Sequence, residues 1–408
     1  MKLRSFFTHV FTVLLVGFML QSCSIDVDYD LQPPKEDTQA RLQQLTDSVF
    51  NHFDSKWNID KGGIFLRVTN PSGSYLVSSN IIPTVQENSH FRIASISKTF
   101  TAAAIMRLHQ QGLLSINDTI TKYLPNTPAY EIPYKDRITI KLLLQHRAGV
   151  FDVTNQDIPQ TVNQPYAGKR YMDYIRQDLK QNTHTFTFDE LIGVIGQNGL
   201  FNHAPDAQFH YSNSGYHLLA KIVEQRTGMS FNDYITKTFF EPLQLTNTYG
   251  VVLGTDQRMK DPFLESFLYL PGQTINPSET NMSGFVADGN IVSTPADISR
   301  WIELLQTGKA GISAANVALM NEMRVADGNH EVYGLGLVYN KGLGFGHDGF
   351  QPSYLSTLRY NPDTKTTVLI VATFAYIPDP ENPMSPEFLE LAHGLLDTGL
   401  RGAQIANR

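Results

Sequence analysis

A stretch with the periodicity of a buried helix face runs from about residue 96 to Gln111. Gly112 follows it, and a glycine adopts the left-handed conformation that ends a helix at little cost. Apolar side chains recur in this stretch at three- and four-residue spacing, which is typical of a helix that buries one face: Ile96, Phe100, Ala103, Ala104 and Leu108. The sequence therefore predicts a helix over 96–111 that packs inside the fold.

Ser95 and Lys98 stand at the start of this predicted helix, three residues apart. At that spacing side chains on a helix are neighbours, with roughly 5–6 Å between their Cβ atoms. The first amides of a helix lack intrahelical partners, and the helix dipole favours negative charge there. A serine beside an amine at such a place has the parts of an activated nucleophile. A capping serine next to a solvated lysine would give the same pattern, so the interpretation depends on motifs elsewhere in the chain.

Two further motifs favour the catalytic interpretation. Tyr211-Ser212-Asn213 precedes an apolar helical segment, and His347-Asp348-Gly349 stands between a glycine-rich turn and a strand. Ser-x-x-Lys, Tyr-x-Asn and a basic residue-x-Gly, in this order, resemble the active-site serine penicillin-recognising enzymes. The resemblance is to their class C β-lactamase and DD-peptidase-like branch. It extends over roughly residues 45–380 and includes Leu142–Gly149, the loop Gly112–Pro125 and the segment Ser293–Asp297.

The resemblance and the hydrophobic pattern together imply an α/β (α+β) fold. We expect an antiparallel sheet flanked by helices and built from both chain ends, with a mainly helical part inserted between them. Within a domain over 41–400, the sheet part covers about 41–110 and 325–400, and the helical part about 111–324. Alternating apolar residues predict strands at 62–69, 74–79, 333–339, 353–360 and 366–374. Helices are expected at 41–56, 139–147, 188–197, 215–227, 230–239, 296–307 and 386–399.

The mechanism that the resemblance implies is acyl transfer through Ser95. Lys98 would assist its deprotonation, and Tyr211 would act with Lys98 as general base, helped by phenolate character beside an ammonium. The resemblance also implies substrate-binding roles for Asn213 and for the third motif. Its oxyanion hole would be the amides of Ser95 and Phe350, with Gly349 leaving room for substrate along the strand.

The third motif departs from the family pattern at Asp348, where threonine or serine is frequent. A carboxylate there would repel a substrate carboxylate unless it were protonated or paired, which favours esterase, amidase or aminopeptidase-like specificity. His347 would supply partial positive charge or orient Tyr211. His146 is expected to be structural, and the aromatic segment 151–198 either covers the site or stabilises the fold.

Other functions are disfavoured by the same residues. The Gly344–Gly349 segment has the spacing of a dinucleotide fingerprint, but no helix pattern follows it. The histidines lack metal-ligand spacing, so neither a metal nor another cofactor is expected. A net charge of −7 without a basic run beyond the first residues argues against nucleic acid as a partner. The remaining hypotheses are a serine hydrolase for small-molecule or short peptide substrates and a non-catalytic binding module that keeps the fold.

The first 40 residues resemble an export signal and a tether. Lys2 and Arg4 precede an apolar run over 10–20 that is too short for a comfortable membrane span. The run ends at Leu20-Gln21-Ser22-Cys23, which resembles a bacterial lipobox and contains the only cysteine. We expect residues 1–22 to be a signal peptide, Cys23 to carry lipid, and 23–40 to be an acidic tether. The protein would then be a membrane-anchored lipoprotein facing the periplasm or the cell surface.

Cys23→Ser should move the protein from the membrane fraction to the soluble fraction, because the thiol is the atom that would carry the lipid. Fractionation and immunoblotting of the two forms provide the measurement. An unchanged distribution, with residues 1–22 still attached by mass spectrometry, would contradict the lipoprotein prediction.

Overall fold

The computed structural model describes residues 37–325, 332–379 and 384–408. The signal peptide, Cys23 and the tether up to residue 36 lie outside these residues, so what was expected of them stays a prediction. Of the helices that the structure describes, none combines the length and the apolar character needed to cross a membrane.

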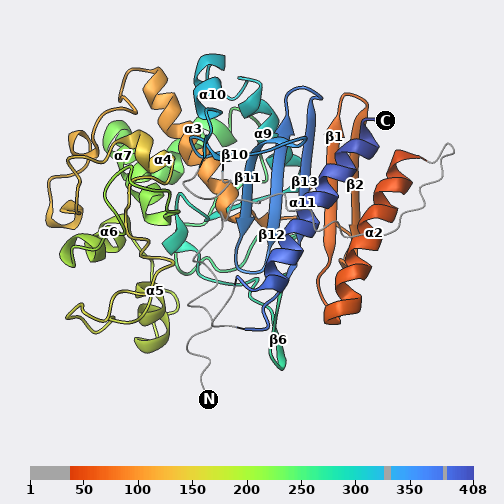
Figure 1. Ribbon diagram of the computed structural model, residues 1–408, viewed down its shortest axis with the longest axis horizontal. Coiled ribbons are helices and arrows are strands. Elements are labelled where there is room, and N and C mark those ends of the chain that lie inside the picture. Colours follow the sequence, from red (N-terminus) through yellow and green to blue (C-terminus); the bar gives the residue numbers. More distant parts are fainter. Residues whose placement is uncertain (1–36, 326–331, 380–383) are drawn as a thin grey trace.

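An eight-stranded antiparallel sheet forms the centre of the described chain (Figure 1). Both ends of the sequence contribute to it, because Ile64 pairs with Ala372 across its middle. This arrangement confirms the expected fold class. The strands lie in the order β2 (Gly73–Ser79), β1 (Ile64–Asn70), β13 (Thr366–Ala372), β12 (Leu355–Asn361), β11 (Gly344–Phe350), β10 (Val338–Asn340), β9 (Val332–Tyr333) and β8 (Arg324–Val325).

Helices cover both faces of this sheet. The terminal helices α2 (Thr38–Trp57) and α11 (Pro386–Ala406) pack side by side on one face (Figure 1). Helices α3 (Ser97–Gln110) and α9 (Pro295–Gln306) lie on the other. Because side chains alternate along a strand, β1 places Ile64 and Leu66 in the core under α2 and α11 and Phe65 in the core around α3. Nearly every residue of β11, β12 and β13 is therefore buried, the polar ones included.

The inserted part is mainly helical, as expected, with long loops and two small sheets. Its helices are α4 (Ile140–Leu144), α5 (Tyr171–Asp173), α6 (Phe188–Gln197), α7 (Asn213–Thr227), α8 (Phe231–Ile235) and α10 (Ala314–Met320), with π-helical turns η4 (Tyr174–Asp178) and η5 (Thr236–Phe240). Short 3-10 turns are η1 (Ala94–Ile96), η2 (Ile120–Lys122), η3 (Pro128–Tyr130) and η6 (Ser283–Phe285). The small sheets join β14 (Phe374–Tyr376), β5 (Phe267–Leu270) and β6 (Gln273–Ile275), and β3 (Phe91–Arg92), β7 (Ile291–Ser293) and β4 (Tyr249–Gly250).

Several boundaries differ from the sequence prediction; for example, α11 ends at Ala406 rather than at residue 399, and α4 ends at Leu144 rather than at residue 147. Helix α2 begins at Thr38, because the Asp37 carboxylate accepts a hydrogen bond from the Gln39 amide and caps the helix inside the expected tether. The single strand expected over 333–339 is two short strands, β9 and β10, separated by a turn at Gly336. Gly336 has φ +73°, and it packs on α3 so tightly that a Cβ there would lie 2.4 Å from Ala102 Cβ.

Gly336→Ala should lower the free energy of unfolding by about 2–4 kcal/mol, because it adds an overpacked contact on α3 to the cost of a left-handed backbone. Gly272→Ala is the matched control, since Gly272 has the same φ of +73° and no atom within 4 Å of a built Cβ. Urea unfolding should show the smaller loss, about 1–2 kcal/mol, in the control. Equal losses would mean that the contact with α3 is not a constraint.

Candidate active site

Ser95 lies in the 3-10 turn η1, which leads directly into α3. Ala94, just before it, has φ +48°, which costs a residue other than glycine of the order of 1 kcal/mol. Strand β11 crosses this turn so closely that a Cβ on Gly349 would lie 2.5 Å from the Ile93 carbonyl oxygen. The strained turn and the glycine together bring the serine against the edge of the sheet.

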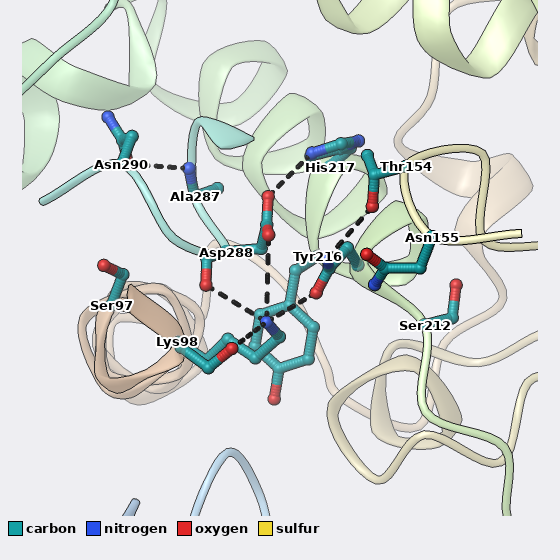
Figure 2. A network of polar contacts seen from close by, with 12 residues as sticks. Ser97, Lys98, Thr154, Asn155, Ser212, Tyr216, His217, Ala287, Asp288 and Asn290 are labelled. Atoms are coloured by element: carbon teal, nitrogen blue, oxygen red, sulfur yellow. Dashed lines mark hydrogen bonds and ion pairs between the residues drawn. The ribbon is translucent and has the colours of Figure 1, made fainter. Parts of the chain in front are cut away.

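Lys98 lies one helical turn after Ser95 and is fully buried. Its Nζ is 3.3 Å from Ser95 Oγ, 2.7 Å from Asn213 Oδ1 and 3.0 Å from the Asp288 carbonyl oxygen, as Figure 2 shows in part. The Asp288 carboxylate is farther away, with Oδ2 at 3.9 Å. Burial lowers the pKa of the Lys98 ammonium to about 8, while Asp288 and Asp152 act in the opposite direction. The structure thus brings Ser95, Lys98 and Asn213 together, as the motif order predicted.

Tyr211 faces the same amine with its ring. Lys98 Nζ is 4.7 Å from the ring centroid, a cation–π geometry, while the buried hydroxyl forms no hydrogen bond of normal geometry among the described residues. Burial raises the pKa of Tyr211 well above its usual range, and the nearby Ser95 hydroxyl opposes this more weakly. The expectation of phenolate character is therefore wrong, because the ammonium meets the π face rather than the oxygen. Tyr211 is a neutral phenol beside the nucleophile.

Asn213 is held in place by a loop that the sequence interpretation did not assign. Asn213 is the first residue of α7, and its backbone amide donates to Asp152 Oδ2 at 3.1 Å. Its side-chain Nδ2 donates to Thr154 Oγ1 at 3.0 Å, and that hydroxyl donates to Asp152 Oδ1 at 2.7 Å. Part of the segment 151–198 therefore forms a wall of the site.

Asp288 and His217 are the other residues that sequence reasoning missed. Asp288 Oδ1 lies 2.9 Å from His217 Nε2, and both residues are buried beside Lys98 (Figure 2). Burial raises the pKa of the Asp288 carboxyl, whereas Lys98 and His217 oppose the rise. One sequence feature could have identified Asp288 and Asp152. Each is an isolated acidic residue among mainly apolar neighbours, where an acid is rarely buried without a partner.

The third motif is placed differently from the expectation at two positions. Asp348 points to the α11 face of the sheet, where Oδ2 pairs with Arg359 Nη2 at 2.7 Å and Oδ1 accepts from Thr357 at 2.8 Å. Its charge is therefore paired and directed away from Ser95. The interpretation of Asp348 as a substrate-binding residue is wrong for this arrangement, because neighbouring residues of a strand face opposite sides.

His347 faces the α3 side but does not reach the cavity. Its Nε2 meets the Tyr333 hydroxyl at 3.0 Å, and Nδ1 lies 2.6 Å from the Asp348 carbonyl oxygen. Burial lowers the pKa of His347 to about 3. It therefore carries no positive charge and orients Tyr333 rather than Tyr211. The ring beside Tyr211 is that of His146, at 4.1 Å between centroids, where Nδ1 accepts from the Ser212 amide.

Gly349 and Phe350 complete the edge next to Ser95. Strand β10 pairs with β11 only as far as Gly346, so the rest of β11 has no strand neighbour on that side among the described residues. Gly349 makes room for the nucleophile turn rather than for substrate. The Phe350 ring packs on Phe388 of α11, so its backbone borders the cavity. About 280 Å³ of space, open to solvent, is lined by Ser95, Asn155, Tyr211, Asn213, Phe285, Asp288, Phe350 and Gln351.

The constellation defines a class: a serine at a helix start, a buried amine beside it, a phenol over that amine, and a strand edge opposite. Within the part of the chain that the structure describes, no three histidine, cysteine, aspartate or glutamate side chains lie as metal ligands do. The beta-lactamase family model matches residues 72–387. The chain therefore belongs to the beta-lactamase family.

Sequence relatives match parts of the chain. Penicillin-binding protein 4* of Bacillus subtilis (strain 168) is 27% identical over 304 residues, which are 70% of this chain and 61% of that protein. Protein flp of Staphylococcus aureus (strain NCTC 8325 / PS 47) is 33% identical over 159 residues, 39% of this chain and 27% of that protein. The chain thus spans less than two thirds of the length of either relative.

Solved structures share the fold over most of the chain. D-amino acid amidase from Ochrobactrum anthropi SV3, in its complex with L-phenylalanine amide, superposes with a TM-score of 0.71 at 20% identity. The match covers 90% of this chain and 100% of that one. D-stereospecific amidohydrolase from Streptomyces sp. gives 0.68 at 20% identity, covering 87% and 99%. At this identity the likeness establishes a common fold.

The buried Lys98 should leave a signature in the pH dependence of stability. Its pKa falls from 10.5 to about 8 on folding. Between these pH values the unfolded chain binds more protons, so stability rises with pH. Relative to Lys98→Met, the wild type should gain about 3 kcal/mol from pH 8 to 10.5. Urea unfolding of both proteins across this range provides the measurement, and parallel stability curves would contradict the assignment.

Proposed function

We propose that the protein is a serine hydrolase that forms an acyl-enzyme on Ser95 with small amide or ester substrates, cell-wall peptides included. The observation that carries the proposal is the set of three contacts around Lys98 Nζ. Two of its neighbours, Asn213 Oδ1 and the Asp288 carbonyl oxygen, can only accept hydrogen bonds, whereas Ser95 Oγ can also donate.

This difference makes neutral Lys98 a suitable base. An uncharged amine has two N–H donors and one lone pair. With the donors directed to Asn213 and Asp288, the lone pair is left for the hydroxyl proton of Ser95. A pKa of about 8 gives an appreciable neutral fraction near neutral pH, which is what a general base requires. This assigns proton removal to Lys98, where the sequence interpretation shared it with Tyr211.

Tyr211 then suits the role of proton donor. Ser95 Oγ attacks the carbonyl carbon, and its proton passes to Lys98 Nζ. The neutral phenol beside Ser95 gives its proton to the departing amine or alcohol and regains one from Lys98. Backbone amides of Ser95 and Phe350 would bind the oxyanion, because both residues border the cavity. Water or another acceptor releases the acyl group by the same steps in reverse.

The expected location is also proposed rather than established. The lipobox-like segment ending at Cys23 supports export and a lipid anchor, with the hydrolase domain held outside the cytoplasmic membrane by the acidic tether.

Ser95 should gain the mass of one acyl or phosphonyl group after incubation with a penicillin or a fluorophosphonate.

The rate of acylation by an activated ester should rise with pH and level off above about 8, as Lys98 loses its proton. Lys98→Ala and Tyr211→Phe should each slow acylation about 10²–10⁴-fold. Their combined effect should be far less than the product, since the two residues act as one unit. Stopped-flow measurement of the acylation rate checks these values.

Tyr339→Phe is the matched control, because Tyr339 is an exposed tyrosine on β10 and its loss of a hydroxyl should leave the rate unchanged. Wild-type acylation by folded Tyr211→Phe would overturn the mechanism. A serine inert to both probes would instead favour a binding module with this fold.

A further inference from the structure

Two carboxyl groups lie in the buried surroundings of Lys98. Asp152 and Asp288 both act on the Lys98 ammonium. Asp152 is bonded by four donors, namely the amides of Thr154 and Asn213, the Thr154 hydroxyl and the Asn155 carboxamide, and the Arg170 guanidinium also acts on it. Asp152 is therefore well provided with partners inside the fold, and Asp288 is the carboxyl group that borders the cavity.

The histidines near Lys98 have different partners. The pKa values of His146 and His347 are lowered by burial, so both rings are neutral. His217 Nε2 is hydrogen-bonded to Asp288, while its buried Nδ1 has no partner among the described residues. Asp288 is thus paired closely with His217 and only loosely, at 3.9 Å, with the Lys98 amine.

Asp288 offers an acceptor to the pocket. Its Oδ1 is occupied by His217, but Oδ2 has no hydrogen bond with any residue that the structure describes and is 3.9 Å from Lys98 Nζ. Asp288 and Ser95 both line the cavity, and both lie within 4 Å of the same amine nitrogen. An amino group on the carbon atom next to a carbonyl bound at Ser95 can therefore reach Asp288 Oδ2.

Gln351 supplies a second acceptor at the same place. Its side chain is 3% exposed and lines the cavity, and its carboxamide has no hydrogen-bond partner among the described residues. A Cβ built on Gly289 would lie 2.5 Å from Gln351 Oε1, so the carboxamide rests on the backbone next to Asp288. The carboxamide atoms are not fully enclosed, so they can bond to a ligand or water in the cavity.

We propose that Asp288 and Gln351 form a subsite for a substrate ammonium group, so that the preferred substrates are amides or esters of amino acids with a free amino group. This deepens the proposed function and depends on acyl transfer by Ser95. An ammonium has three donors and one positive charge. It would bond to Asp288 Oδ2 and Gln351 Oε1, which both line the cavity. A substrate carboxylate at the same place would meet the Asp288 carboxyl group without a donor to bond to.

Three matched anilides test the subsite: alanine p-nitroanilide, N-acetylalanine p-nitroanilide and propionyl p-nitroanilide, the alanine compounds as both enantiomers. They share the leaving group and differ in the charge beside the scissile carbonyl. The value of kcat/KM should be about 10- to 100-fold higher for the free amine than for the propionyl compound, as for a hydrogen-bonded charged group. Gln351→Lys should bring the ratio near one, because its own ammonium would occupy the subsite.

Asp288→Asn should also bring the ratio near one. Because this residue touches Lys98, the ratio between substrates is the readout rather than either rate, and Gln351→Lys keeps the test decisive if Asp288→Asn does not fold. Asp363→Asn is the matched control: it removes the same charge from an exposed turn between β12 and β13 and should leave the ratio unchanged.

Labelling of Ser95 by a fluorophosphonate separates the two proposals. A labelled serine with a ratio of one or less, or with a ratio that survives Gln351→Lys, overturns the subsite alone. If Ser95 takes no label and the protein hydrolyses none of the anilides, the proposed function is overturned.

Discussion

The burial of one lysine amine determines how the helical part of the molecule is joined to the sheet. Removing an ammonium from water is tolerated only where acceptors and opposite charge replace the solvent. Lys98 obtains them from Ser95, just before its own helix, and from two segments distant in sequence: Asn213 at the start of α7 and Asp288 in the loop before β7. Each of the two distant segments is fixed in turn by a further contact, Asn213 by Asp152 and Asp288 by His217. The chemistry and the docking of the helical part on the sheet therefore depend on the same atom.

The motif order was sufficient to predict that Ser95, Lys98, Tyr211 and Asn213 lie together, and periodicity was sufficient for the sheet and most helices. Periodicity described α3 less well, because it counts apolar residues only. Ser97, Thr99 and Thr101 are as buried as Phe100, since each hydroxyl has a partner inside the fold. A helix predicted to bury one face is thus enclosed on nearly all sides. Such partners come from β7, α9 and the loop at Ala287, and no local pattern reveals them.

Electrostatic expectations were less reliable, for reasons that the contacts make clear. The behaviour of Asp348 depended on whether it was paired, and its partner Arg359 lies on the neighbouring strand, in a register that spacing alone does not define. For Tyr211, nearness to an ammonium was interpreted as stabilising a phenolate, although burial and approach to the ring face act the other way. Asp152 and Asp288 were missed because an isolated acid in an apolar run has no partner visible in the sequence.

The pairing of β1 with β13 also governs when the chain can fold. Ile64 pairs with Ala372. The strand edge beside Ser95 is held in the sheet by β12 and β13, which are synthesised much later than β1. The first hairpin emerges from the ribosome long before its partner and remains an open edge during that interval. Folding through such a pair is slow, because the entropy of closing the long loop is lost before the strands gain their contacts, as in other proteins with distant strand pairs. Ser95, although it is synthesised long before β12 and β13, meets its neighbouring strand edge only after these strands have been added.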